Sequence, residues 1–171
     1  MSHASEELRA RQAPLKERYR DDAAAAVILL KASASLDAAG ISCRVDTGRA
    51  LVEAGLHPAT GGSGLQACSG DMLLEALAAC AGVTLRAVAT ALDVPVRGGR
   101  IVAEGDLDVR GTLGMSKEAP VGLRAIRLRF LLDTDAGPDQ LATLLKLTER
   151  YCVVLQTLRT PPAVTVTVAP P

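Results

Sequence analysis

Cysteine thiols are the side chains of this chain best suited to chemistry, and there are four of them: Cys43, Cys68, Cys80 and Cys152. In a reducing compartment, free thiols, metal ligands and redox groups are favoured over structural disulfides. A thiolate is a nucleophile, its first oxidation product is a sulfenic acid, and a second thiol protects that acid from irreversible oxidation. Four cysteines allow three pairings, and the sequence by itself selects none of them.

Other kinds of site have little support. His3 and His57 are the only histidines and the chain has no Cys-x-x-Cys motif, so a zinc site is the third and weakest hypothesis. The run Gly61-Gly-Ser-Gly lacks the Gly-Lys-Ser/Thr ending of a phosphate-binding loop. Aromatic residues make up 2% of the chain, and 19 basic residues balance 19 acidic ones. We therefore expect neither a nucleic-acid partner nor a membrane surface, and no cofactor or metal.

Residues 71–92, DMLLEALAACAGVTLRAVATAL, predict a long central helix with Cys80 about midway along it. Apolar residues fall on nearly every side of the helical wheel, which indicates a helix buried all round. Ser69 and Gly70 precede it and supply an N-cap candidate, and Asp71 places an acid in the first turn.

The remaining elements indicate an α+β fold of one domain, residues 25–171, preceded by a polar helical arm at residues 1–24. We interpret the arm, which Pro14 interrupts, as a surface or dimer-clasping element. Strands are expected from apolar alternation, and helices from apolar stripes. The expected elements are strands at 25–35, 41–46, 49–53, 100–110, 123–133 and 163–169, a turn at 37–40, helices at 140–150 and 152–159, a loop at 55–70 and a flexible flap at 111–122.

The N-terminal residues MSHASEELRARQ are charged where a secretory signal needs an apolar core. The longest uncharged run of the central helix, residues 76–85, is too short to span a bilayer. We therefore expect a cytoplasmic protein.

Three motifs in a fixed order carry a resemblance to a known family. They are Gly61-Gly-Ser-Gly, then Leu77-Ala-Ala-Cys80 on the long helix, then Glu149-Arg-Tyr-Cys152-Val-Val-Leu after a strand pair. In these features the chain resembles the OsmC/Ohr family of osmotically induced and organic-hydroperoxide-resistance proteins, over roughly residues 25–168. The resemblance implies antiparallel sheets wrapped around a long central helix in an intertwined homodimer.

The same resemblance implies a thiol peroxidase that needs no metal or flavin. Cys80 would attack the peroxide as the peroxidatic cysteine, and Cys152 would resolve the sulfenic acid to a disulfide that an external dithiol reduces. Active members also use an arginine, for which Arg44 and Arg49 are candidates, and a glutamate at the helix start, where Asp71 is the nearest acid here. The apolar helix favours alkyl or fatty-acid hydroperoxides over hydrogen peroxide.

Several interpretations stay open beside this one. The alternative function is a non-catalytic OsmC-like dimer, in which Cys80 is packed as a small apolar side chain. Without a nearby cation, burial among aliphatic groups would raise the pKa of Cys80. Thr84 lies one turn after Cys80 and could hydrogen-bond to it, and a helix start at Cys152 could lower the pKa of that thiol. Cys43 is expected in the core, and Cys68 in a loop or as a third redox thiol.

Overall fold

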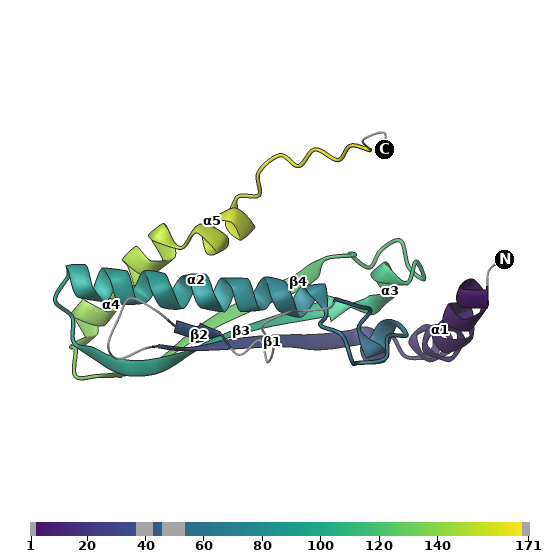
Figure 1. The fold of residues 1–171 in the computed structure, drawn as a ribbon, viewed down its shortest axis with the longest axis horizontal. Helices are drawn as coiled ribbons and strands as arrows, with labels where there is room; N and C mark the ends of the chain where they lie inside the picture. Colours follow the sequence, from purple (N-terminus) through teal and green to yellow (C-terminus); the bar gives the residue numbers. More distant parts are fainter. Residues whose placement is uncertain (1–2, 37–42, 46–53, 169–171) are drawn as a thin grey trace.

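A long helix lying on one face of an antiparallel sheet organises the molecule, as the computed structural model shows for residues 3–36, 43–45 and 54–168 (Figure 1). The helix is α2 (Ser69–Ala91), and the four strands of the sheet are ordered β2-β1-β3-β4. The predicted mixed α+β class is therefore confirmed.

The sheet is a set of long antiparallel pairings. Its strands are β1 (Val27–Leu36), β2 (Cys43–Val45), β3 (Val96–Asp108) and β4 (Leu123–Thr134). Strand β3 is central, because it pairs with both long neighbours along most of its length. In β4, apolar and charged residues alternate, as predicted, so that one face meets the core. On the other face Arg127 pairs with Asp106 at 2.7 Å.

The core lies between α2 and the sheet, with two further helices closing one side. Leu74, Leu77 and Leu85 of α2 are fully buried against Ile101 and Ala103 of β3. Helices α4 (Pro138–Tyr151) and α5 (Val153–Arg159) join the same core cluster, α4 through buried Leu144 and α5 through partly buried leucines. Small side chains make up much of α2, which allows the neighbouring elements to approach it closely.

Helix α2 differs from its prediction at its start and on one face. It begins at Ser69, so the residue at the N-cap position is Cys68, whose side chain makes no capping bond. Met72, Leu73 and Val83 are solvent-exposed. These positions share one side of the helix, so a single chain buries α2 only in part. Expected burial on all sides is therefore not reached within one chain.

The length and composition of α2 also decide whether the described chain contains a helix that could cross a membrane. It is long and apolar enough to cross a bilayer by length and composition, although the uncharged run within it is short. Half of its most apolar window is buried inside this chain. A core helix of a globular domain passes the same test, and the packing of α2 on the sheet is of that kind.

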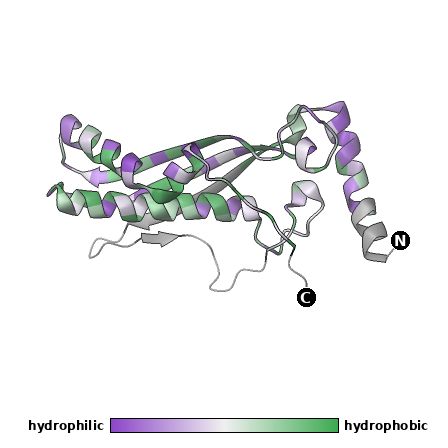
Figure 2. Ribbon diagram, turned by 90° about the horizontal axis from the view of Figure 1, so that it is seen from above, coloured by the Kyte–Doolittle hydropathy of each residue, from purple (hydrophilic) through white to green (hydrophobic). Residues whose placement is uncertain are grey.

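The N-terminal arm forms α1 (His3–Asp21), with Pro14 inside the helix. Figure 2 shows hydrophilic residues along much of α1, in contrast to the apolar α2. Tyr19 is nonetheless buried, and its hydroxyl donates a hydrogen bond to the carbonyl of Ala59 at 2.8 Å. Tyr19 packs with Ala26 and Val109 in a second, smaller core. The arm is therefore docked on the domain at its C-terminal end.

Residues 111–122, predicted as a flexible flap, are closely packed at their first glycine. The connection begins with a short helix, α3 (Val109–Thr112), and then turns back on itself. Gly111 is buried with the backbone of Pro120 so close that a side chain at position 111 would collide with it. The backbone N–H of Ala119 donates to Ser116 Oγ at 3.2 Å. Close packing, which only glycine permits at 111, holds this connection in place.

The predicted last strand is wrong for the single chain. Residues 163–168 have no strand pairing, and Val164, Val166 and Val168 are 81%, 88% and 96% exposed. Figure 1 shows this segment leaving the body of the domain after α5. The valine and threonine alternation fits a strand, but no strand of the described chain lies beside it. The turn at 37–40, the strand at 49–53 and the ends of the strand at 41–46 lie outside the described residues.

The buried face of α2 predicts where truncation is costly. Leu77→Ala should lower the free energy of unfolding by about 2–5 kcal/mol, because it leaves a cavity against the sheet. Leu65→Ala removes the same atoms from a side chain that is 76% exposed and should cost less than about 0.5 kcal/mol. Urea unfolding of both variants measures the difference, and equal losses would contradict this assignment of the core.

Candidate active site

The structure brings Cys80 and Cys152 together, as the sequence predicted. Cys80 lies midway along α2, and Cys152 lies at the junction of α4 and α5, which pack on α2. The Cys152 thiol hydrogen-bonds to the Cys80 sulfur. Cys152 is completely buried, whereas Cys80 is partly accessible. The two free thiols therefore differ in their access to a molecule that arrives from solvent.

A break between two helices positions Cys152. Its backbone N–H donates to the carbonyl of Thr148 at 2.9 Å and closes α4, while its carbonyl accepts from the N–H of Gln156 at 2.9 Å and opens α5. Its φ of −72° and ψ of 104° are extended, so the chain changes direction there. The N–H groups of the first α5 turn have no acceptor within their own helix. They can therefore donate to a sulfur atom that lies at the start of this helix.

Those backbone N–H groups act on Cys80. Burial works to raise the pKa of the Cys80 thiol, but hydrogen bonds from Val154 N–H, the Cys152 thiol, the Thr84 hydroxyl and Val153 N–H stabilise the thiolate. The net result is a Cys80 pKa below its ordinary value. Hydrogen bonding to the charged form therefore outweighs desolvation here. The expectation that a Cys80 without a nearby cation would have a raised pKa is wrong for this site.

The second thiol has the opposite character. Burial raises the pKa of Cys152 to about 11, and the neighbouring Cys80 adds to the rise, although the N–H groups of Leu155 and Val154 oppose it. The prediction that a helix start would lower the pKa of Cys152 is therefore wrong. The α5 start does lower a cysteine pKa, but that cysteine is Cys80. Of the two thiols, Cys80 therefore loses its proton first as the pH rises.

Thr84 is the side chain that sequence reasoning placed correctly beside the thiol. It follows Cys80 by four residues on α2, so both lie on the same side of the helix. Its hydroxyl is one of the groups that lower the Cys80 pKa. A helix start at Cys152 was expected, but its backbone N–H groups were assigned to Cys152 and not to Cys80, because the sequence does not show which sulfur they face.

The other predicted site residues are not brought to the thiols by the described structure. Asp71 lies in the first turn of α2, which is regular from Ser69 onward. Nine residues of α-helix separate Asp71 from Cys80 by about 13 Å along the axis and put it on the opposite side. Arg44 lies in β2, where it pairs with Ser35 of β1, and its side chain is outside the described set. Arg49 lies outside the described residues altogether.

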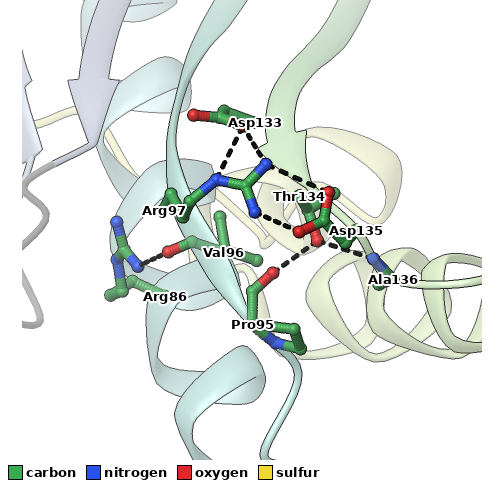
Figure 3. A network of polar contacts seen from close by, with 8 residues as sticks. All are labelled: Arg86, Pro95, Val96, Arg97, Asp133, Thr134, Asp135 and Ala136. Carbon is green, nitrogen blue, oxygen red and sulfur yellow. Dashed lines mark hydrogen bonds and ion pairs between the residues drawn. The ribbon is translucent and has the colours of Figure 1, made fainter.

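Arg86 is a buried cation on the same helix that was not nominated from the sequence. Its side chain is 8% exposed, and Nη1 donates to the carbonyl of Val96 at 2.5 Å (Figure 3). Its Nε and Nη2 atoms have no hydrogen-bond partner within the described part of the chain. Six residues of helix place it on a different side from Cys80. The signal in the sequence is that Arg86 is the only charged residue between positions 76 and 92.

A polar cluster at the end of the sheet holds the start of α4. Arg97 of β3 donates to Asp133, which lies near the end of β4, and to Asp135, which lies just beyond it (Figure 3). The Thr134 hydroxyl donates to the carbonyl of Pro95. The N–H of Ala136 donates to Thr134 Oγ1 at 3.1 Å, just before α4 begins. Because α4 ends at Cys152, these contacts fix the base of the helix that presents the second thiol.

A cavity of about 410 Å³ lies between β4 and α5, and neither Cys80 nor Cys152 is among its lining residues. Leu155 links the cavity to the thiol pair, because its side chain lines the cavity while its N–H interacts with Cys152. Apolar side chains form most of the wall, and Arg124, Glu149 and Arg159 lie around them. Arg159 pairs with Glu149 at 2.8 Å. The cavity therefore suits an apolar molecule.

The remaining candidates play no part in this arrangement. Cys68 is a partly exposed free thiol at the start of α2, far along the helix from Cys80. Among residues 3–36, 43–45 and 54–168, no three His, Cys, Asp or Glu side chains gather closely enough to hold a metal ion. The chemistry available to the described residues is that of two thiols in contact.

The hydrogen bond from Thr84 predicts a measurable change in thiol ionisation. Thr84→Val keeps the shape but removes the hydroxyl donor, so the pKa of Cys80 should rise. Because the thiolate is the reacting form, the midpoint of iodoacetamide alkylation of Cys80 should move to higher pH, as followed by mass spectrometry. Thr90→Val is the matched control, since the Thr90 hydroxyl donates to the carbonyl of Arg86 instead. An equal midpoint in both variants would exclude the role given to Thr84.

Comparisons with known proteins agree with this geometry. Residues 62–167, well over half of the chain, match the family model described as OsmC-like protein. The fold is similar to that of an OsmC-like hydroperoxide resistance protein from Jannaschia sp. CCS1, with a TM-score of 0.59 and 15% identity, over 81% of this chain and 91% of that one. Comparison with curated proteins gave no match. Both thiols and the long helix that carries Cys80 fall within the matched region, and the chain belongs to the OsmC-like protein family.

Proposed function

We propose that this protein is a cysteine-based peroxidase that reduces organic hydroperoxides, with Cys80 as the peroxidatic and Cys152 as the resolving cysteine. The observation that carries the proposal is the contact between the two thiols and the opposite shifts of their pKa values. An accessible thiolate next to a buried, protonated thiol suits a two-step redox reaction. Membership of the OsmC-like family and the name of the structural neighbour support a role in peroxide resistance.

In the first step the Cys80 thiolate attacks the terminal oxygen of the hydroperoxide. The sulfur–oxygen bond forms as the O–O bond breaks, so the sulfur is oxidised to a sulfenic acid and the alkoxide leaves. A proton from water then converts the alkoxide to an alcohol. The lowered pKa of Cys80 keeps a larger fraction of this thiol in the reactive form.

In the second step Cys152 loses its proton and attacks the sulfenic sulfur. The disulfide forms and hydroxide leaves, taking up the released proton as water. Oxidation of Cys80 removes the thiolate charge that helps raise the pKa of Cys152, while the N–H groups of Leu155 and Val154 still act to lower it. Cys152 is therefore easier to deprotonate at the stage where it must react. An external dithiol then reduces the disulfide and restores both thiols.

The cavity between β4 and α5 supports an organic substrate. Its apolar wall accepts an alkyl or acyl body, whereas hydrogen peroxide would gain nothing from it. Leu155 and Leu158 of α5 line the cavity, and the first turn of the same helix contacts Cys80, so a substrate tail seated there would extend along α5. Arg44 and Arg49 stay predictions for the cation at the site, and Asp71 for an acid that orients it.

We propose that the working form is a homodimer in the cytoplasm. The exposed stripe of α2 runs through Met72, Leu73, Ala76 and Val83 and borders Cys80. A second copy covering this stripe would bury the helix on all sides, as its composition indicates. The exposed valines of residues 163–168 provide a strand that a partner's sheet could accept. The partly accessible thiol would then lie at the interface of the two copies.

Three cysteine variants test the redox roles. Wild-type protein should consume an organic hydroperoxide with a dithiol reductant, and Cys80→Ser should reduce turnover to background because the nucleophile is absent. Cys152→Ser should accumulate Cys80 as a sulfenic or higher acid, detected by mass spectrometry. Cys68→Ser is the matched control and should keep full turnover.

The alternative is a non-catalytic binding protein with packed cysteines, which the same assay can distinguish. If Cys80→Ser and wild type remove peroxide at the same slow rate, the peroxidase proposal is refuted. Normal turnover in Cys152→Ser with no trapped oxidised Cys80 would refute only the resolving role.

The C-terminal segment provides a test of the dimer. Val164→Asp with Val166→Asp places charges on the apolar side of the segment, so it should weaken dimerisation by roughly 100-fold. Thr165→Asp with Thr167→Asp adds the same charge to the other side and should weaken it much less. Sedimentation of both double variants over a concentration series measures the dissociation constant. Equal dissociation constants for wild type and both variants would exclude this segment from the interface.

A further inference from the structure

A second cavity lies away from the cysteines, between the C-terminal half of α1 and the segment that follows α3. Its volume is about 400 Å³, and its polar lining includes Lys16, Arg20, Arg110 and Ser116. We propose that this cavity binds a small organic phosphate, a phosphate monoester with an apolar or neutral body. The cavity rests on the smaller core around Tyr19 and Val109, not on the core that holds the thiols.

Positive charge is the first feature that points to an anion. Three of the lining residues are cations, and the lining contains no carboxylate. Lys16 and Arg20 are four residues apart on α1, where like charges repel each other. A bound dianion between them would relieve this repulsion.

Arg110 is held in position for such a ligand. Its Nε and Nη2 donate to the buried carboxylate of Asp108 at 3.0 and 2.6 Å. These two bonds fix the plane of the guanidinium group, and neither of them uses Nη1. Asp108 also attracts Arg124 at 3.9 Å, so its single negative charge is shared between two cations. Glu118 attracts Arg110 electrostatically and is the acid that competes with a bound anion.

Ser116 offers a neutral donor on the same wall. Its Oγ accepts hydrogen bonds from the N–H groups of Glu118 and Ala119, at 3.3 and 3.2 Å. A hydroxyl carries one proton of its own, and neither bond uses it. The proton is therefore available for a phosphate oxygen. Two bonds to the backbone also hold the hydroxyl in place before a ligand arrives.

The size and the remaining walls favour an organic phosphate over the inorganic ion. A volume of about 400 Å³ is that of a small-molecule site, and phosphate alone would leave most of it empty. Leu113, Met115 and the ring of Tyr19 form the apolar part of the lining. Lysine as a compact charge and arginine as a planar fork are the usual phosphate-binding pair. The ligand therefore has a dianionic head and a body that contacts an apolar wall.

Calorimetric titration of the full-length protein with phenyl phosphate at low salt tests the proposal. Binding is expected, and Lys16→Gln and Arg20→Gln should each weaken it about five- to tenfold. Arg20 is exposed and Lys16 is half-buried, and glutamine keeps much of the length of either side chain, so these variants should keep the fold. Lys117→Gln is the matched control, because it removes the same charge next to the cavity but outside its lining, and it should change affinity less than about twofold. No heat of binding, or an equal loss in all three variants, would overturn the proposal.

Two further titrations identify the chemical class. Inorganic phosphate should bind more weakly than phenyl phosphate, because it lacks the body that meets Leu113 and Met115, and phenol should not bind, because it lacks the charge. Affinity for inorganic phosphate equal to that for phenyl phosphate would overturn the assignment of an organic ligand. Binding of phenol as tight as that of phenyl phosphate would overturn the phosphate site itself.

Discussion

The contact between Cys80 and the start of α5 is the interaction on which the site depends. It requires α4 to end at Cys152 and the chain to turn there, so that N–H groups without acceptors in their own helix face the sulfur of another helix. If α4 continued unbroken through residue 152, those N–H groups would bond within the helix. The Cys80 thiol would then lose two of the donors that lower its pKa, while burial would still raise it. One helix break therefore supplies both the second thiol and the donors that activate the first.

The rest of the fold can be understood as support for that contact. Helix α2 is fixed by leucines packed on the sheet, and α4 is fixed at its base by the cluster around Arg97, Thr134 and Asp133. Both sides of the thiol pair are thus attached to β3 and β4, the longest pairing in the sheet. Because the helices that carry the two thiols are anchored to the same pair of strands, the two sulfur atoms keep their relative position. The thiol pair can therefore stay aligned while the C-terminal segment and one face of α2 are uncovered.

Most of the fold could be predicted from the sequence, and the failures share one physical cause. Alternation in β4, the stripe of α4 and the apolar length of α2 report burial against neighbours within the chain, and the structure confirms them. The same signals at Val164, Val166 and Val168 and on the outer face of α2 indicate burial that one chain does not supply. Periodicity shows that a side is apolar but not which molecule covers it. Gly111, predicted as part of a flexible flap, marks a point of close packing between two backbone segments.

The site was predicted in its residues but not in its electrostatics. Cys80, Cys152 and Thr84 follow from side-chain types and spacing, whereas the donors that lower the Cys80 pKa are backbone atoms, which every residue carries and no motif reveals. The candidates Arg44, Arg49 and Asp71 followed from the resemblance to active members of the family, which use an arginine and an acid. Arg86 was overlooked because it interrupts an apolar helix without matching any motif.

The backbone N–H groups that lower the pKa of Cys80 also bear on the start of α2. Active members of the family have a glutamate there, whereas this chain has Cys68-Ser-Gly-Asp71. A cation held by an acid at that position would stabilise the thiolate through a charge, and its effect would fall with salt and with any change of the acid. Val153 and Val154 donate from the backbone of a helix start, which no substitution other than one to proline removes. The lowered pKa of Cys80 therefore does not depend on the residues where this chain departs from the pattern. Whether an arginine also takes part in the proposed reaction is a question separate from the hydrogen bonds that lower the pKa of Cys80.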